Sequence, residues 1–174
     1  MIITYHGESF VKVQHGDLMV AINPNGTNQV RVGGKDPFII DGPGEYEVSN
    51  VFIRGVGGPG PDETINTIYI LTLDGLRLVH WGRLGDGKLS EAVEAEVGET
   101  DILFAPLTNS PAVAYRLALT FQPKIIIPLS ESTSLLGQFL KEAGAEKVSP
   151  IDKLVLKKKD VSEKEGEIIL LNMV

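Results

Sequence analysis

The chain has 174 residues, of which 43% are hydrophobic and 22% are charged, and its formal net charge at pH 7 is −7. This length and balance predict one globular domain over residues 1–174 with a sizeable core. The acidic charge argues against a protein whose whole surface binds nucleic acid, and the absence of cysteine excludes disulfides, thiolate nucleophiles and cysteine-ligated metals.

The first segment of the chain, MIITYHGESF, lacks the basic start and the long apolar stretch of a signal peptide. No run in the sequence approaches the roughly 18 consecutive apolar residues of a membrane span. We therefore expect a cytoplasmic protein that does not bind a membrane.

Short strands separated by turns are predicted for the first two-thirds of the chain. The predicted strands are 1–5, 9–14, 17–22, 37–40, 45–48, 51–56, 66–73 and 76–81. Tight turns are expected at His15-Gly16-Asp17 and at Asp74-Gly75, and the DGPGE segment is expected to turn the chain between two strands. Residues 57–63, GGPGPDE, are too rich in glycine and proline for regular structure, so we expect a loop there.

The rest of the chain alternates strands with helices. Strands are predicted at 101–107 and 124–129, and helices at 88–96, 110–121 and 132–144. This alternation predicts α/β layering. The C-terminal segment is expected to form two strands around a charged turn, with the lysines at 157–159 as a solvated strand end. A phosphate-binding patch is the alternative interpretation of these lysines.

The histidines and serines do not form a recognisable active site. No pair among His6, His15 and His80 has the HxH or HxxxH spacing of zinc ligands. His80 alternates with Leu76 and Leu78 on an apolar face, which favours a hydrogen-bonded core histidine. No serine lies in a GxSxG motif, and no glycine-rich segment has the spacing of a phosphate-binding loop. Composition and spacing alone therefore predict an α/β domain without a visible catalytic centre.

Several segments, in the same order along the chain, resemble the metallo-β-lactamase superfamily, near its predicted zinc-dependent, lactonase-like hydrolases. They are ITYHGESFVKV with LMVAINP, DPFIIDGPGEYEVSNVFIRGVG, NTIYILTLDGLRLVHWGRLGD, DILFAPL and LTFQPKIIIPLSE. The GPGEYE and NTIY…HWGRLGD blocks are the specific ones. The resemblance implies two packed sheets with helices outside, a shortened αββα four-layer sandwich.

In that superfamily, histidines and aspartates at strand ends hold one or two metal ions, which activate a water molecule. The positions that match those ligands carry other residues here, namely Glu8, Asn23, Arg83, Asp86 and Ser130. The segment before the GPGEYE block also lacks the family's His-x-His-x-Asp-His motif. His80 matches a family position, and His6 lies two residues before Glu8. The resemblance therefore implies a remnant pocket of these seven residues that has lost its metal.

Arg83 stands where the family has a metal-binding aspartate. An arginine cannot ligate a metal and keeps its charge at physiological pH, so in a metal cavity it would repel a divalent ion. We expect Arg83 to pair with Asp86, Glu8 or Glu45, or to bind a small anion. The leading hypothesis is a catalytically degenerate, metal-free binding or interaction module, whose partner is a small anion, another protein or a second copy in a homodimer.

Two other functions stay open on the sequence alone. The first is a metal-dependent hydrolase of lactone, ester or phosphoester bonds, in which His6, Glu8, His80 and Asp86 converge on one zinc or other divalent ion. The second is nucleic-acid binding, which the resemblance raises because some members of the superfamily process RNA or DNA. The net charge of −7 and the clustering of only the lysines at 157–159 oppose it, so we expect no nucleic-acid partner. A three-ligand group around one point would support the hydrolase, and Arg83 in the same cavity would argue against it.

Overall fold

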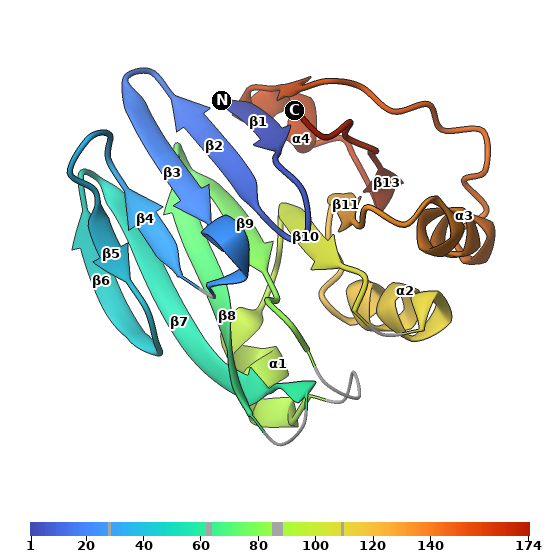
Figure 1. The fold of residues 1–174 in the computed structure, drawn as a ribbon, viewed down its shortest axis with the longest axis horizontal. Coiled ribbons are helices and arrows are strands. Elements are labelled where there is room, and N and C mark those ends of the chain that lie inside the picture. The colour runs from blue at the N-terminus through green and yellow to red at the C-terminus, as the bar shows by residue number, and fades with distance from the viewer. Residues whose placement is uncertain (28, 62–63, 85–88, 109) are drawn as a thin grey trace.

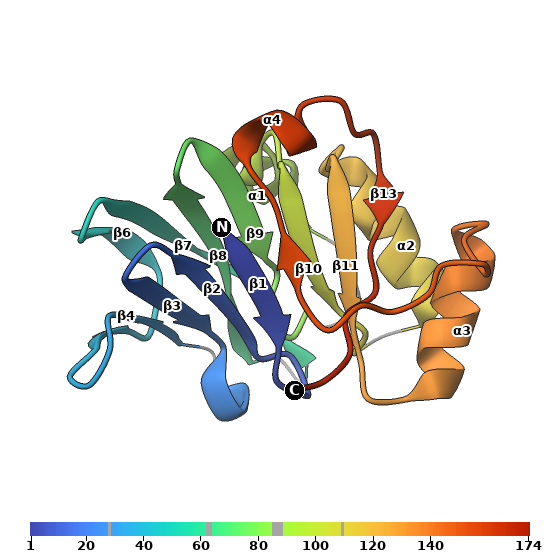
Figure 2. The ribbon, with the colours of Figure 1, turned by 90° about the horizontal axis from the view of Figure 1, so that it is seen from above.

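The computed structural model describes residues 1–27, 29–61, 64–84, 89–108 and 110–174. Two β-sheets pack face to face, and three longer helices lie along the outside of the second sheet (Figure 1). Figure 2 shows the same layers from above. No helix in these described ranges combines the length and the apolar character that a membrane span requires.

The first sheet has six strands, all antiparallel to their neighbours, in the order β12-β1-β2-β3-β4-β5. Its strands are β1 (Ile2–Tyr5), β2 (Val11–His15), β3 (Leu18–Ile22), β4 (Val30–Val32), β5 (Phe38–Ile40) and β12 (Leu154–Val155). Val11 and Val13 of β2 are fully buried while Gln14 is exposed, as the alternation of a half-buried strand requires. The expected turn after His15 closes the β2–β3 hairpin, and Gly16 takes a φ of 59° there.

The second sheet has seven strands in the order β13-β11-β10-β9-β8-β7-β6. They are β6 (Gly44–Val48), β7 (Val51–Pro59), β8 (Ile65–Leu73), β9 (Leu76–His80), β10 (Ile102–Pro106), β11 (Ile125–Leu129) and β13 (Glu167–Ile168). Strands β6 to β9 are antiparallel to one another, whereas β9, β10, β11 and β13 run parallel. The carboxyl ends of the parallel strands therefore meet at one edge of the sheet.

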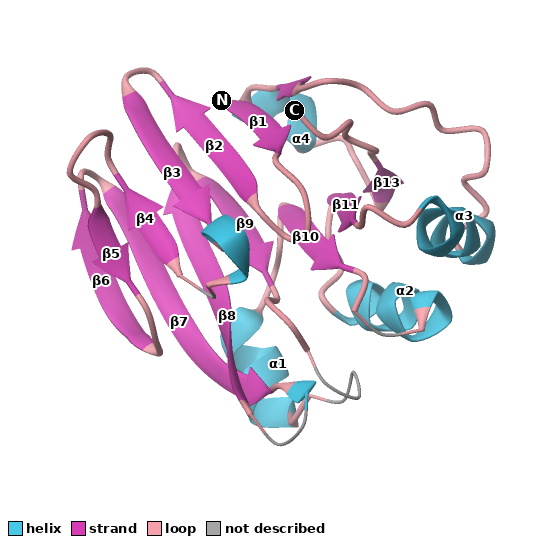
Figure 3. Cartoon of the chain, viewed as in Figure 1, coloured by secondary structure: helices cyan, strands magenta, loops and turns pink. Residues whose placement is uncertain are grey.

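Helices connect the parallel strands, as the alternation in the sequence predicts (Figure 3). They are α1 (Glu91–Val97), α2 (Pro111–Thr120) and α3 (Thr133–Glu142), and the shorter helices are η1 (Pro24–Gly26) and α4 (Lys158–Val161). Helix α2 begins with Pro111 in its first turn, and the Ser132 hydroxyl caps α3 by accepting a hydrogen bond from the Leu135 N–H at 3.3 Å. Both helix starts agree with the sequence prediction.

Two apolar clusters hold the layers together. One fills the space between the sheets with alternate residues of both, such as Val13, Val20, Tyr69 and Phe104. The other packs the outer face of the second sheet against the helices, with Trp81 among its largest buried side chains. This arrangement confirms the predicted layered α/β sandwich, and its helical cover is concentrated on the second sheet.

The prediction of a loop over residues 57–63 is wrong for residues 57–59. Strand β7 continues to Pro59, and its residues 57–59 pair with β8 from Thr67 to Ile65. Pairing with a long neighbouring strand outweighs the weak strand preference of glycine, and proline is tolerated at a strand end. Residues 62 and 63 lie outside the described residues.

The turns at DGPGE and at the C-terminus do not join neighbouring strands. The DGPGE segment carries the chain from β5 in the first sheet to β6 in the second, and residues 156–166 carry it from β12 to β13 in the same way. The lysine run is not a strand end: Lys157 is the N-cap of α4, and the next two lysines are helical and exposed. Local turn signals cannot distinguish a hairpin from a crossing between sheets, because both begin with the same turn residues.

Candidate functional site

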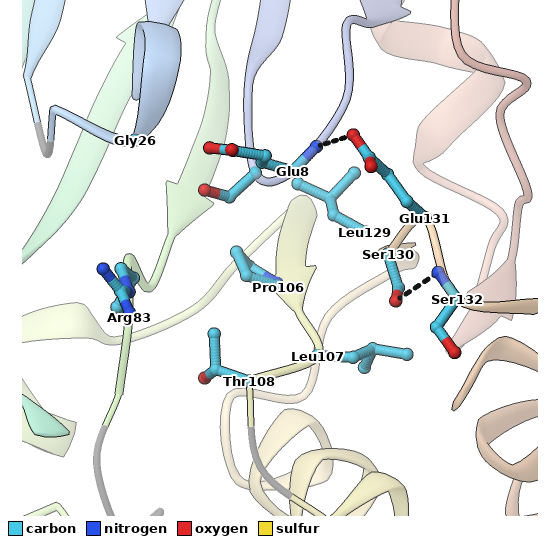
Figure 4. A pocket seen from close by; sticks show the side chains of 11 residues that line it. Glu8, Gly26, Arg83, Pro106, Leu107, Thr108, Leu129, Ser130, Glu131 and Ser132 are labelled. Atoms are coloured by element: carbon cyan, nitrogen blue, oxygen red, sulfur yellow. Dashed lines mark hydrogen bonds between the residues drawn. The ribbon is translucent and has the colours of Figure 1, made fainter. Parts of the chain in front are cut away.

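A cavity of about 410 Å³ lies where β10 and β11 end and where α2 and α3 follow. Ligands of α/β proteins commonly bind at this edge of a sheet. Figure 4 shows the side chains around it. The lining residues are Glu8, Ser9, Gly26, Arg83, Pro106, Leu107, Thr108, Leu129, Ser130, Glu131 and Ser132. We call Glu8, Arg83 and Glu131 the rim. The floor is Ser9, which lines the cavity, together with its buried hydrogen-bond partners Asn23 and His80, which lie behind the lining.

His80 belongs to the floor and is completely buried. Its Nδ1 accepts a hydrogen bond from the Gly82 N–H at 3.0 Å, and its Nε2 donates to the Ser9 carbonyl oxygen at 2.8 Å. Main-chain groups therefore occupy both ring nitrogens, with one nitrogen donating and the other accepting, as in a neutral imidazole. Burial lowers the pKa of His80 to about 4. This is the hydrogen-bonded core histidine that the sequence favours, and it has no nitrogen free for a metal.

The rest of the floor is also buried and hydrogen-bonded. Asn23 is 1% exposed, and its Nδ2 donates to the Ser9 hydroxyl. Ser9 thus joins Asn23 through its side chain and His80 through its main chain. Sequence reasoning missed Ser9 as a member of this network, because only the fold brings the loop after β1 onto the end of β9.

Arg83 lies on the rim at the end of a braced turn. The Asn66 Oδ1 accepts a hydrogen bond from the Arg83 N–H at 2.8 Å, while its Nδ2 donates to the Trp81 carbonyl oxygen at 2.7 Å. Gly82 between them takes a φ of 65°, and a Cβ there would lie only 2.2 Å from the Asn66 Oδ1. Trp81 donates from its Nε1 to the Pro106 carbonyl oxygen at 3.1 Å. Asn66, which the sequence analysis missed, therefore fixes where the arginine leaves the chain.

The acidic side of the rim joins the loop after β1 to the loop after β11. The Glu131 Oε1 accepts a hydrogen bond from the Glu8 N–H at 2.9 Å. Tyr5 donates to the Glu8 carbonyl oxygen at 3.0 Å. Burial raises the pKa of the Tyr5 phenol to about 12, and the charges of Glu131 and Glu8 add to this shift. The Glu8 main chain and the Glu131 carboxylate thus meet on the rim, while the Glu8 carboxylate points toward Gly26. Glu131 is a third residue that sequence reasoning missed.

The structure brings some of the predicted pocket residues together and separates others. Glu8, Arg83 and Ser130 line the cavity, whereas Asn23 and His80 do not line it but bond the lining residue Ser9. His6 is not among the lining residues: its Nε2 bonds the Thr4 hydroxyl at 2.9 Å and its ring packs on Phe10. Burial lowers the pKa of His6, with the Lys12 charge acting in the same direction.

The structure tests two of the three expected ion-pair partners of Arg83, namely Glu8 and Glu45. Glu45 pairs with Arg54 at 3.8 Å instead of with Arg83. Asp86 lies outside the described residues. Within the part of the chain that the structure describes, Arg83 forms no ion pair with Glu8 or with any other carboxylate. Arg83 is exposed and lines the cavity.

The described side chains do not fit a zinc ion at this edge of the sheet. Among them, no three histidine, cysteine, aspartate or glutamate residues come together as a metal would require. The Glu8 and Glu131 carboxylates share the rim with the cation Arg83, and His80 has both nitrogens occupied. The described members of the alternative set, His6, Glu8 and His80, therefore do not form a three-ligand group.

Comparison with known proteins adds to this geometry. A family model described as a beta-lactamase superfamily domain matches residues 28–130. No curated protein matches the chain.

Solved structures share the fold over nearly the whole chain. A proposed zinc-dependent hydrolase of the metallo-β-lactamase superfamily from Thermotoga maritima has a TM-score of 0.76 and 22% identity, covering 98% of this chain and 99% of that one. A proposed metal-dependent hydrolase from Parabacteroides distasonis has a TM-score of 0.61 and 13% identity, with 99% and 93% covered. A metallo hydrolase from the archaeon Ignicoccus hospitalis has a TM-score of 0.55 and 13% identity, with 90% and 99% covered. At these identities the likeness extends to the fold alone.

Proposed function

The chain belongs to the β-lactamase superfamily, and from this premise we propose that it is a metal-free binding module rather than a metallohydrolase. The observation that carries the proposal is the position of Arg83, whose permanent cation lines the cavity at the strand ends. A divalent ion placed there would be repelled by the guanidinium, and the described residues would not supply the three or more ligands that a zinc site needs.

The floor of the cavity supports a binding role rather than a catalytic one. His80 bonds the main-chain oxygen of Ser9 and not its hydroxyl, so it is not placed to remove the hydroxyl proton. The Ser9 hydroxyl accepts from Asn23 instead. Nucleophilic catalysis requires a base in hydrogen-bond contact with the nucleophile, and the described residues of the cavity provide no such pair.

The proposed ligand is a small molecule that carries an anionic group. Arg83 offers a planar set of N–H donors suited to a carboxylate or a phosphate. The hydroxyls of Ser130 and Ser132 line the same cavity and accept backbone N–H bonds, so their own protons are left to donate. Helices α2 and α3 begin beside it, and their N-terminal partial charges favour an anion. The cavity volume of about 410 Å³ leaves room for a ligand of several heavy atoms.

Metal retention tests the proposal. The untagged protein is incubated with zinc, manganese and iron salts, desalted and analysed by inductively coupled plasma mass spectrometry. We expect no stoichiometric metal and an unchanged thermal midpoint with each ion. Stoichiometric retention would overturn the proposal and would make His6, Glu8 and Asp86 the first residues to replace.

Two further expectations from the sequence belong to the proposal. One is a cytoplasmic location, and the other is a homodimer or a complex with another protein. Light scattering of the purified protein over a range of concentrations tests self-association. A constant monomer mass at the highest concentration would remove the homodimer.

A further inference from the structure

We infer that the ligand of this cavity is a zwitterion, with an anionic group on Arg83 and an ammonium group on Glu8 and Glu131. This inference rests on the proposed function, because it takes the cavity to be a small-molecule site without a metal. It adds the class of ligand, which neither the family nor the fold specifies.

The first argument is the separation of charge across the cavity. In Figure 4, Arg83 lies on one side, Glu131 on the opposite side, and Glu8 along the rim between them. Arg83 forms no ion pair with either carboxylate within the described chain. The opposite charges therefore face the same space without neutralising each other, and a ligand with both charges can satisfy both sides.

The second argument is that the acidic side is held in place. The Glu131 carboxylate accepts the Glu8 N–H at 2.9 Å, which orients it before any ligand arrives. Gly7 and Gly26 leave space for these carboxylates: a Cβ on Gly7 would lie 2.7 Å from the Glu131 Oε1, and one on Gly26 would lie 3.1 Å from the Glu8 Oε2. Preorganised charged groups cost less entropy when they bind a ligand.

The third argument is the charge balance. One guanidinium and two carboxylates line the cavity, so a simple anion would gain one attraction and meet two repulsions. A simple cation would leave Arg83 without a partner. A zwitterion is attracted at both of its ends. A ligand with a single charge binds less tightly, because it leaves either Arg83 or the carboxylates without a partner.

The fourth argument is the apolar stretch between the charged groups. Pro106, Leu107 and Leu129 line the cavity and are largely buried, and they come from the ends of β10 and β11. These apolar side chains suit the methylene groups of a ligand. The chemical class is therefore an amino acid with a short aliphatic chain between its amine and its carboxylate.

Calorimetric titration with matched probes tests this inference. The zwitterions are glycine, 4-aminobutanoate and 6-aminohexanoate, and the singly charged analogues are butanoate and butylamine. We expect at least one zwitterion to bind about tenfold or more tightly than both analogues, because each lost charge-assisted contact costs at least that factor. Butanoate that binds as tightly as every zwitterion would overturn this inference and leave the proposed anion-binding function standing.

Charge-neutral variants locate the two ends of the ligand. Glu131→Gln and Glu8→Gln remove charge but keep length, and each is expected to weaken the zwitterion about tenfold without weakening butanoate. Arg83→Gln is expected to weaken both ligands. Exposed residues on the two helices that begin beside the cavity supply controls: Arg116→Gln on α2 and Glu142→Gln on α3 are expected to change neither affinity.

The remaining outcomes also decide between the hypotheses. Absence of binding by all zwitterions overturns the inference, whatever the metal content. Stoichiometric metal in the retention experiment overturns the proposed function itself, since it would show that the cavity is built for an ion. Zwitterion binding that Glu131→Gln and Glu8→Gln leave unchanged would also overturn the inference, because the amine would then lie elsewhere.

Discussion

The polar groups of the floor and of the rim differ in their burial and in their pairing. On the floor, His80 and Asn23 are almost completely buried, and hydrogen bonds occupy both ring nitrogens of His80. On the rim, Glu8, Arg83 and Glu131 are exposed and form no ion pair with one another. A buried polar group without a hydrogen-bond partner is costly, whereas an exposed charge is solvated by water and needs no partner within the protein. We therefore expect the floor to maintain the fold, and we propose that the rim binds the ligand.

Replacing His80 is the most severe way to test this division. His80→Ala removes a buried ring and leaves the Ser9 carbonyl and the Gly82 N–H without partners. We expect a loss of about 3 kcal/mol in the free energy of unfolding, measured by urea denaturation. The control is His15→Ala, since His15 lies in the β2–β3 hairpin with a side chain that is 41% exposed. Equal stabilities of the two variants would show that the floor is not a structural network.

Acid is the second test of the floor. Because the pKa of His80 is lowered to about 4, the unfolded chain binds more protons than the folded one between that value and the ordinary value of about 6.5. Stability is therefore complete above pH 6.5 and falls as the pH drops, by about 2 kcal/mol at pH 5. The lowered pKa of His6 acts in the same direction.

Urea unfolding at pH 7.5 and at pH 5, for the wild type and for His80→Gln, measures this contribution. The variant is expected to lose less stability on acidification, because it no longer carries the buried imidazole. An identical pH dependence in both proteins would contradict the assignment to His80.

Asn66 braces the turn that leads from β9 to Arg83 on the rim, and its replacement should show an intermediate effect. Asn66→Ala removes the hydrogen bonds to the Arg83 N–H and the Trp81 carbonyl oxygen, which we expect to cost about 2 kcal/mol of stability. Ligand affinity should fall as well, since the arginine loses its brace. Calorimetric titration with the best zwitterion, under conditions where the variant is folded, measures the second effect. Unchanged affinity would show that the brace does not position Arg83.

Arg83→Gln should have the smallest effect on stability. The side chain is exposed and has no ion pair within the described residues, so we expect a change below about 0.5 kcal/mol. The same variant is expected to lose ligand binding. A large destabilisation would instead show that Arg83 stabilises the fold, and it would contradict the view that rim residues contribute little to stability.

Much of the fold could be predicted because its signals are local. The β2–β3 and β8–β9 hairpins follow from Gly16 and Gly75 beside alternating apolar residues, and the start of α2 follows from Ser110-Pro111. The errors at 57–59 and at Lys157 have a different cause. Those residues take the conformation that neighbouring segments of the sheet and core impose, and no local pattern reports such neighbours.

The sequence by itself determined that the chain has no cysteine and three histidines, and the resemblance placed an arginine where relatives have an aspartate. These facts already disfavour a metal site. Only the tertiary structure decided that His80 is locked by the Ser9 and Gly82 backbone, that Asn66 braces the Arg83 turn, and that Glu131 joins Glu8 across 123 residues of sequence. The reason is that the ends of separate strands become neighbours only through the order of strands in the sheets, and that order is set by the burial of whole apolar faces rather than by any short segment.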